Sequence, residues 1–322
     1  LPLKSAGTVY AVPGVEASAA PYYKVDRSYY SIVNLENTDK GYTYSFSATA
    51  EKTFDFGMNM VASYTFGHSK SVYDGTSSVA YSNWKYNYAI DTNSPVLSYS
   101  SFDQPHRVLF TLGYTTPKYC NGLMQTNVAL TYNGYSGGRY SLTMSENTDF
   151  NGDGFRGNSL LYIPTADELA TMQFADIMGK DAEGKKVVKK TAQEQRDLFE
   201  AFIAGDSYAK NHRGEYAKRN SNLGKFEHQI DLHLAQTFFY LKNRGSKIQL
   251  TFDVLNFANM LNKKWGASWA NSYNVTPLKV TGVKKGADGV YTPTYQWNGY
   301  TKPNKASIGS RWHAQLGFKV IF

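Results

Sequence analysis

Polar and apolar side chains alternate strictly at the end of the sequence, in RWHAQLGFKVIF (residues 311–322). Leu316 belongs to the apolar parity of this segment, whereas Gln315 and Lys319 belong to the polar one. A period of two places alternate side chains on opposite faces of a β-strand. Such a strand packs its apolar face either on the core of a soluble sandwich or on the lipid around a membrane barrel.

Six further segments show the same alternation. Each is about as long as the 9–11 residues that a tilted strand needs to cross a bilayer. They comprise residues 42–50, 54–66, 106–114, 123–132, 229–240 and 247–257. Together with the C-terminal segment, they predict an all-β chain with seven or eight strands of membrane-spanning length.

The connections between these segments are alternately short and long. Three short ones comprise residues 51–53, 117–122 and 241–246, and three long ones comprise residues 68–104, 136–226 and 260–310. Outer-membrane barrels have short turns at one end and long loops at the other, whereas loops longer than about 15 residues are uncommon in compact soluble domains. The alternation therefore favours a transmembrane antiparallel barrel, with Trp312 and Phe322 at the two membrane interfaces.

Composition excludes a helical membrane protein and argues against a nucleic-acid-binding one. Aromatic residues make up 15% of the sequence, yet the mean hydropathy is −0.46 and no run approaches the roughly 20 apolar residues of a spanning helix. The formal net charge is +8, but the lysines and arginines are scattered or lie in predicted loops, so no nucleic-acid partner is expected. The single cysteine, Cys120, excludes a cysteine-ligated metal cluster within this chain.

The longest connection carries two helix signals. Thr165 with Glu168, and Thr191 with Glu194, each match the capping-box pattern. We expect two short helices here, and we interpret residues 136–226 as a structured extracellular loop within a barrel portion that covers residues 1–322.

Four stretches resemble a known family. They are SFDQPHRVLFTLGY, NGYSGGRYS with DFNGDGFRGNSLLYIP, LFEAFIAGDSYAKNHRGEYAKRNSNLGKFEHQIDLHLAQTF, and IQLTFDVLNFANMLNKKWG. In this order they are similar to the C-terminal barrel portion of Oar-like TonB-dependent outer-membrane receptors. The resemblance implies a barrel of about 22 strands with an N-terminal plug. Since neither a plug nor a TonB box is visible, we expect another chain or a missing part to supply the plug and the remaining strands.

The resemblance also implies partners. The TonB energy-transducing complex would act through the plug, and a surface lipoprotein is a further partner of this kind of receptor. Phe318 and Phe322 resemble the C-terminal signal that barrel-assembly machinery reads. Lipopolysaccharide is expected around the barrel, and loop lysines such as Lys185 and Lys284 carry charges that suit its phosphates.

One loop motif suggests calcium. Asp149, Asn151 and Asp153 have the spacing of the first half of a calcium-binding loop. Leu160 occupies the twelfth position, where a bidentate acid is expected. The alternative is a turn stabilised by Asx hydrogen bonds. No cofactor is required, and calcium in residues 149–160 is the metal that this motif would take.

Charged residues of the polar parity predict the inner wall of the barrel. These residues are Arg107, Asp231, His233, Asp253, Arg311, His313 and Lys319. They suit a water-filled or plugged lumen; the alternative is a wall that only hydrogen-bonds a plug. The histidines show no metal spacing, and no nucleophile elbow is present, so we expect no enzyme activity.

These patterns lead to one hypothesis and two alternatives. The chain is interpreted as part of a TonB-dependent receptor that takes up a nutrient or other ligand across a Gram-negative outer membrane. Its C-terminus would be periplasmic and its long loops extracellular. The alternatives are a non-transporting surface, adhesion or assembly protein, and a small self-contained barrel with hydrolase activity.

Overall fold

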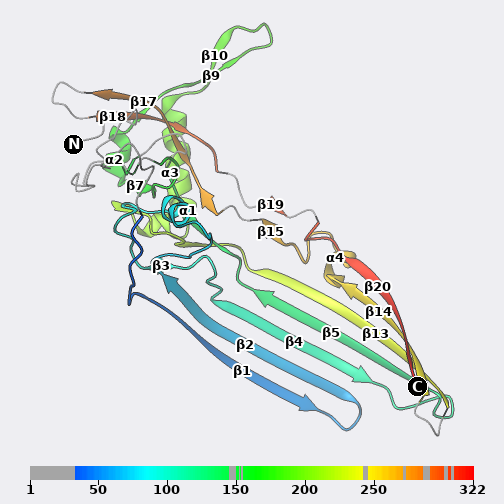
Figure 1. The fold of residues 1–322 in the computed structure, drawn as a ribbon. Helices are drawn as coiled ribbons and strands as arrows, with labels where there is room; N and C mark the ends of the chain where they lie inside the picture. The colour runs from blue at the N-terminus through cyan, green and yellow to red at the C-terminus, as the bar shows by residue number, and fades with distance from the viewer. Residues whose placement is uncertain are drawn as a thin grey trace.

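The computed structural model describes residues 33–144, 150–151, 153, 155–241, 246–270, 273–285, 291–300, 304–305 and 308–322. Its main feature is an antiparallel sheet in which seven long strands follow one another in chain order (Figure 1). The strands are β1 (Gly41–Thr53), β2 (Met58–Ser71), β4 (His106–Thr115), β5 (Met124–Tyr135), β13 (Glu227–Leu241), β14 (Ser246–Leu255) and β20 (His313–Ile321). An eighth, β3 (Ser98–Tyr99), pairs with the end of β2.

The register places the even-numbered residues of all seven strands on one face. Phe252, for example, pairs with Leu234 on one side and with Leu316 on the other. Because paired residues point to the same face, the apolar residues of every strand form one continuous surface. The odd-numbered residues, which are mostly polar, form the opposite face.

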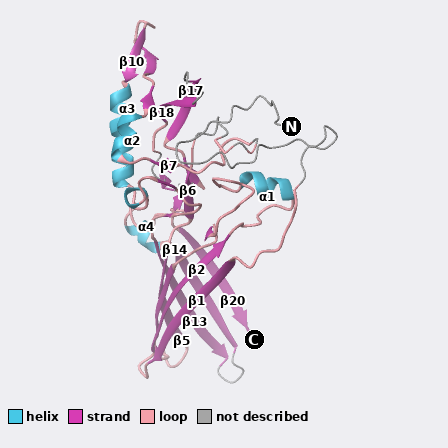
Figure 2. Cartoon of the chain, turned by 90° about the vertical axis from the view of Figure 1, so that its left-hand side faces the viewer, coloured by secondary structure: helices cyan, strands magenta, loops and turns pink. Residues whose placement is uncertain are grey.

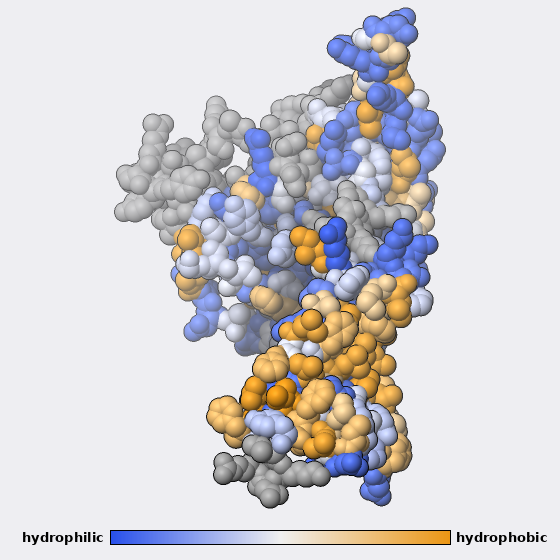
Figure 3. Space-filling model, turned by 90° about the vertical axis from the view of Figure 1, so that its right-hand side faces the viewer, coloured by the Kyte–Doolittle hydropathy of each residue, from blue (hydrophilic) through white to orange (hydrophobic). Residues whose placement is uncertain are grey.

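The apolar face is exposed in this chain. Leu316 is 82% exposed and Phe318 is 68% exposed, and hydrophobic side chains cover the strand region in Figure 3, below a largely hydrophilic loop region. A contiguous apolar surface of this extent marks contact with lipid or with another apolar surface. The pattern is apolar outside and polar inside, as in transmembrane barrels.

The first short turn lies later in the chain than the sequence predicted. Residues 51–53 do not form it, since they continue β1, where Glu51 pairs with Val61. The turn instead occupies residues 54–57, where the Gly57 amide donates to the Phe54 carbonyl. Gly57 has a φ of 96°, a conformation that glycine adopts without strain. The alternation of residues 54–57 therefore belongs to the turn, while the second predicted turn connects β4 and β5 as expected.

The long connections contain short elements. The first holds α1 (Ala80–Tyr86) and β3. The second holds β6 (Arg139–Leu142), β7 (Tyr162–Ile163), α2 (Ala166–Thr171), β8 (Gln173–Phe174), β9 (Ile177–Lys180), β10 (Lys186–Lys190), α3 (Ala192–Gly205), the 3-10 helix η1 (Ala209–Asn211), β11 (Glu215–Tyr216) and β12 (Asn222–Leu223). The third holds α4 (Phe257–Leu261), β15 (Trp269–Ala270), β16 (Asn274–Val275), β17 (Leu278–Lys285), β18 (Tyr291–Trp297) and β19 (Asn304–Lys305).

Both predicted capping boxes are confirmed. The Thr165 side chain accepts from the Glu168 amide at the start of α2, and Thr191 accepts from the Glu194 amide at the start of α3. In each case the glutamate also accepts from the threonine amide. Within the described parts of the chain, no helix has the length and apolar character needed to span a membrane.

The second and third connections share one hydrophobic core. Phe199 and Ile203 of α3 are completely buried, and Trp297 of β18 packs on this core with its ring 6.3 Å from the Phe199 ring. Strand β18 also pairs in parallel with β8 of the second connection. We call the described residues of 136–226 and 273–300 the lid. It lies at one end of the long strands (Figure 2).

The sheet is open at both edges. Neither β1 nor β20 pairs with a further long strand among the described residues. An unpaired edge in lipid leaves backbone groups unsatisfied, each at a cost of several kcal/mol. The described sheet has the all-β, antiparallel architecture that the sequence predicted, and its two edges need partners if the apolar face lies in lipid.

The two faces of β20 provide a test of the register. An arginine near the middle of the lipid face should cost about 2–4 kcal/mol of folding free energy, because its charge is removed from water. We therefore expect Leu316→Arg to impair barrel assembly, measured by heat-modifiable migration on gels, and Gln315→Arg to assemble almost normally. Equal defects in the two variants would show that the face assignment is wrong.

Candidate functional site

The inner face carries a polar group where β13, β14 and β20 lie side by side. His233, Asp253 and Gln315 occupy one row across these strands. The Nδ1 atom of His233 lies 2.5 Å from Oδ1 of Asp253, and both side chains remain partly exposed. Asp231 accepts a hydrogen bond from the Asn256 amide at 2.7 Å. These groups can bind a polar surface or ligand inside the barrel.

The other predicted wall residues are spread over the same face, with one exception. Arg107, His313 and Lys319 have odd positions in β4 and β20, on the same face as Asp253. Arg311 does not belong to this wall, because β20 begins only at His313 and the Arg311 amide donates to the Ile308 carbonyl in a preceding turn. The predicted strand was extended two residues too far at its start.

A buried carboxylate connects the strand ends to the lid. Asp103 is 2% exposed and accepts from Nε of Arg139 at 2.8 Å and from the Ser69 amide at 2.7 Å. His68 Nδ1 lies 3.1 Å from the same carboxylate. The Arg139 guanidinium also stacks 3.8 Å from the centre of the Tyr99 ring. This cluster fixes β6 of the lid to the end of β2.

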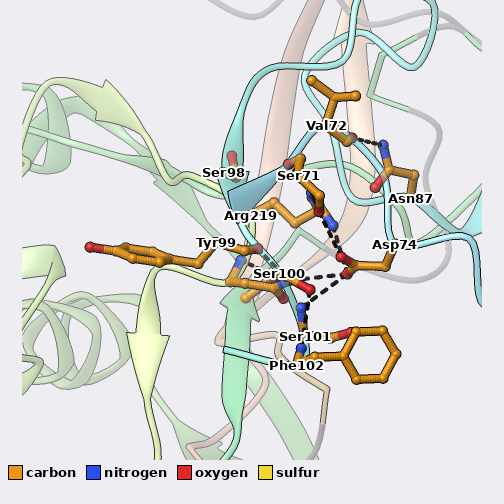
Figure 4. A network of polar contacts seen from close by, with 12 residues as sticks. Ser71, Val72, Asp74, Asn87, Ser98, Tyr99, Ser100, Ser101, Phe102 and Arg219 are labelled. Carbon is orange, nitrogen blue, oxygen red and sulfur yellow. Dashed lines mark hydrogen bonds and ion pairs between the residues drawn. The ribbon is translucent and has the colours of Figure 1, made fainter. Parts of the chain in front are cut away.

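A second carboxylate, Asp74, connects the first long connection to the lid (Figure 4). It lies 2.8 Å from Nη1 of Arg219, which is buried, and it accepts from the Ser71 hydroxyl and the Ser101 amide. Burial acts to raise the pKa of Asp74, but Arg219 and these hydrogen bonds outweigh it and lower that pKa below its ordinary value. Burial lowers the pKa of Arg219, against the opposing effect of Asp74.

Glu227 is a third carboxylate that attaches a loop to the strand ends. It begins β13 and is 8% exposed. Its carboxylate accepts from the Tyr135 hydroxyl at 2.9 Å and from the Trp269 amide at 2.8 Å. The third long connection is thereby attached to the inner side of the barrel rim.

The sequence interpretation missed Asp74, Asp103 and Glu227. Two signals were present, since Asp103 lies in SFDQPHR and Arg219 lies in HRGEYAKRN, stretches that carry the family resemblance. Nothing local indicated the pairing, because Arg219 and Asp74 are 145 residues apart in the chain.

The histidines lie apart from one another and have different partners among the described residues. His68 has a carboxylate partner in Asp103, but aromatic rings of Tyr44, Phe66 and Tyr99 surround it and no hydroxyl is hydrogen-bonded to it. Throughout the described ranges, no three His, Cys, Asp or Glu side chains are grouped closely enough to hold a metal ion.

Comparison with known families agrees with this architecture. The family model described as outer membrane beta barrel domain matches residues 5–274. The chain belongs to this outer membrane β-barrel family. No curated protein and no solved structure matches the chain.

Membership of the outer membrane β-barrel family places the protein in the outer membrane. In barrels of this kind the outer apolar face contacts lipid, which accounts for the exposed apolar face of this sheet. Strand β20 lies outside the matched range, but its register against β14 continues the same apolar face. The outer membrane barrel therefore extends to the end of the chain.

The calcium motif lies in the loop of this outer membrane barrel that follows β6. Asp149 lies outside the described residues. Asp153 is 7% exposed and accepts from the Phe155 amide at 2.7 Å, the Asn158 side chain at 2.6 Å and the Thr92 hydroxyl at 3.0 Å. The Phe155 bond is that of an Asx turn. Both carboxylate oxygens of Asp153 thus accept hydrogen bonds from protein donors, as the turn interpretation predicts. Calcium binding stays a prediction.

The Asp74–Arg219 pair yields a prediction about the lid. Asp74→Asn removes the charge opposite a buried guanidinium, which should lower the local stability by about 3 kcal/mol. In the native protein, the pKa of Asp74 is lowered from 3.8. Its contribution is therefore complete above pH ~4 and is lost as the pH falls through the lower, folded-state pKa. Hydrogen exchange of the Ser101 amide would measure both effects, with the exposed Asp39→Asn as the control.

Asp153 allows the two interpretations of the calcium motif to be separated. If the Asx turn is correct, Asp153→Ala should loosen residues 150–160 equally in calcium and after chelation, because the lost partners are protein donors. Hydrogen exchange across this loop would show the effect. Protection that appears only with calcium in the native protein would instead establish a metal site.

Proposed function

We propose that the chain is part of a TonB-dependent receptor that takes up a nutrient or other ligand across the outer membrane. The observation that carries this proposal is an open sheet of long strands with a polar inner face and a folded lid over one end. Such a sheet suits a wide barrel that other strands and a plug complete. The family resemblance of the loop motifs supports the same interpretation.

The inner face suits a wide lumen better than a narrow one. A barrel closed from about eight strands is filled by its own side chains. Here the inner face holds small hydroxyl pairs such as Ser47–Thr65 and Thr49–Ser63, each with its oxygens 2.9 Å apart. It also holds Gly113 and Gly317, which contribute no side chain. Such small residues do not provide the bulk that fills the core of a narrow barrel, which suits a lumen occupied by a plug domain.

The alternatives fit fewer observations. A self-contained hydrolase would need a closed small barrel and, most commonly, a serine or cysteine hydrogen-bonded to a histidine. The described strands do not close on themselves, and among the described residues the histidines pair with tyrosines and carboxylates instead. A non-transporting surface protein would use the lid alone. The partly exposed His233–Asp253 pair and the other charged wall residues favour transport over that alternative, because they give the inner face groups with which to hold a plug.

We infer that the lid and long loops are extracellular and that the short turns and the C-terminus are periplasmic. Support comes from the loop lengths, since outer-membrane barrels keep short turns on the periplasmic side. All three long connections leave the same end of the sheet (Figure 1).

The transport proposal is tested by finding what completes the barrel. An affinity tag inserted after Gly184, in the exposed β9–β10 turn, allows the assembled protein to be isolated from outer membranes after chemical crosslinking. We expect a plug domain in the same assembly and a covalent adduct with TonB that disappears when the plug is deleted. An assembly that contains no plug would contradict the transport proposal.

The orientation is tested with the single cysteine. Cys120 is exposed in the turn between β4 and β5, so a membrane-impermeant maleimide should label it only after the outer membrane is permeabilised. A matched variant, Gly184→Cys in a Cys120→Ser background, should be labelled on intact cells. Labelling of Cys120 on intact cells would overturn the orientation.

A further inference from the structure

Two tyrosine–histidine pairs lie on the lipid face, at the end of the strands next to the lid. The Tyr64 hydroxyl is 2.8 Å from Nδ1 of His106, and the Tyr132 hydroxyl is 2.8 Å from Nδ1 of His228. The distance between the ring centroids is similar in the two pairs, at 6.2 Å for Tyr64 and His106 and 6.0 Å for Tyr132 and His228. All four residues have even positions and therefore belong to the lipid face.

The two pairs have the same register displacement. Tyr64 lies opposite Val108, and its histidine is two residues nearer the loops on the neighbouring strand. Tyr132 lies opposite Ile230, and its histidine has the same displacement. Such diagonal neighbours are within reach of aromatic side chains. In each case the tyrosine is deeper in the membrane and the histidine is nearer the headgroups.

Gly134 makes room for one of the pairs. It pairs with both Val108 and His228. A Cβ atom at this position would lie 2.3 Å from the Tyr132 hydroxyl oxygen and 2.9 Å from the Phe226 ring. Because such a contact cannot exist, the glycine allows the tyrosine ring to cross its backbone and reach His228.

In the tautomer in which Nδ1 accepts from the tyrosine, each histidine keeps one hydrogen-bond donor. A neutral imidazole carries its proton on one nitrogen and accepts at the other. When Nδ1 accepts from the tyrosine, the proton is on Nε2, and no described residue accepts from Nε2 of either ring. At a membrane interface, headgroup oxygens and water can accept from such a donor, and a phosphate oxygen, being charged, forms the stronger bond. At the opposite end of the strands, the lipid face carries Met58, Met124 and Phe238 together with the cation of Lys52, but no histidine.

We propose that these two Tyr–His pairs bind phosphate groups of lipid headgroups in the outer leaflet, with each Nε2–H donating to a phosphate oxygen. The proposal rests on the orientation given above. The two histidines lie two strands apart, about 10 Å across the sheet, so they can contact two phosphates of one headgroup or of neighbouring lipids. Lys70, on the same face and end, adds a positive charge 4.9 Å from the Tyr99 ring.

The test measures lipid binding to the assembled protein purified from outer membranes. Native mass spectrometry with added bisphosphorylated lipid A would compare the native protein with the double variant His106→Phe and His228→Phe. This variant keeps an aromatic ring at both positions but removes the imidazole nitrogens. Loss of two bonds to a charged phosphate should weaken binding about tenfold or more. His212→Phe, in the lid, is the matched control and should bind lipid A as the native protein does.

Dephosphorylated lipid A distinguishes phosphate recognition from acyl-chain contact. The native protein should bind it as weakly as the double variant binds the phosphorylated form. Equal binding of both lipids by the native protein, or unchanged lipid A binding in the double variant, would overturn the proposal. If Cys120 is protected in intact cells but lipid A binding fails this test, the orientation stands and only the phosphate site is wrong.

Two further variants test whether lipid binding depends on the Tyr132–His228 pair itself and not on the stability of the fold. Tyr132→Phe keeps the ring but removes the bond to Nδ1, and Gly134→Ala displaces the ring. Both should weaken lipid A binding while heat-modifiable migration stays normal, because neither changes the strand register. Normal lipid A binding in both variants would show that the tyrosine–histidine geometry is not used.

Discussion

In a membrane, every backbone N–H and C=O group of a spanning strand must find a partner within the protein. The seven long strands meet this requirement by pairing with their chain neighbours, and the pairing determines which side chains share a face. Leu232, Leu130 and Val254, for instance, are brought into one row by two consecutive ladders. The apolar lipid face and the polar inner face both follow from these ladders. The edges of β1 and β20 have no long-strand partner among the described residues, so in lipid each edge needs another strand to bond its backbone groups.

The loop end is held by a different kind of interaction. Three carboxylates, Asp74, Asp103 and Glu227, lie where the strands end. Asp103 and Glu227 are buried and Asp74 is partly buried, and each accepts from donors on other segments. Buried charges are tolerated only when they are paired and hydrogen-bonded. Each carboxylate therefore fixes the position of one loop segment relative to the barrel. Hydrophobic packing between α3 and β18 then joins two connections into one body.

Sequence reasoning recovered the strands, their faces and the two capped helices, because each depends on residues close together in the chain. The alternation that ends at Phe322 and the Thr191–Glu194 capping box are of this kind. The carboxylate clusters could not be predicted, since Asp103 meets Arg139 only after the intervening strands have paired. The start of β20 and the first hairpin turn were misplaced for the same reason. Polar and apolar residues go on alternating through Arg311 and through residues 54–57, although Arg311 precedes β20 and residues 54–57 form a turn.

The joint core of the lid determines what the cell surface displays, given the proposed orientation. The lid is assembled from segments far apart in the chain, such as α3 and β18, between which 85 residues lie. Antibodies or phage that bind there recognise the folded protein and not a linear peptide. The β9–β10 hairpin differs, because it projects beyond the rest of the lid as one continuous stretch (Figure 1). A synthetic peptide of residues 177–190 contains this whole hairpin, which makes it the part of the lid best suited to raise antibodies that also recognise the native surface.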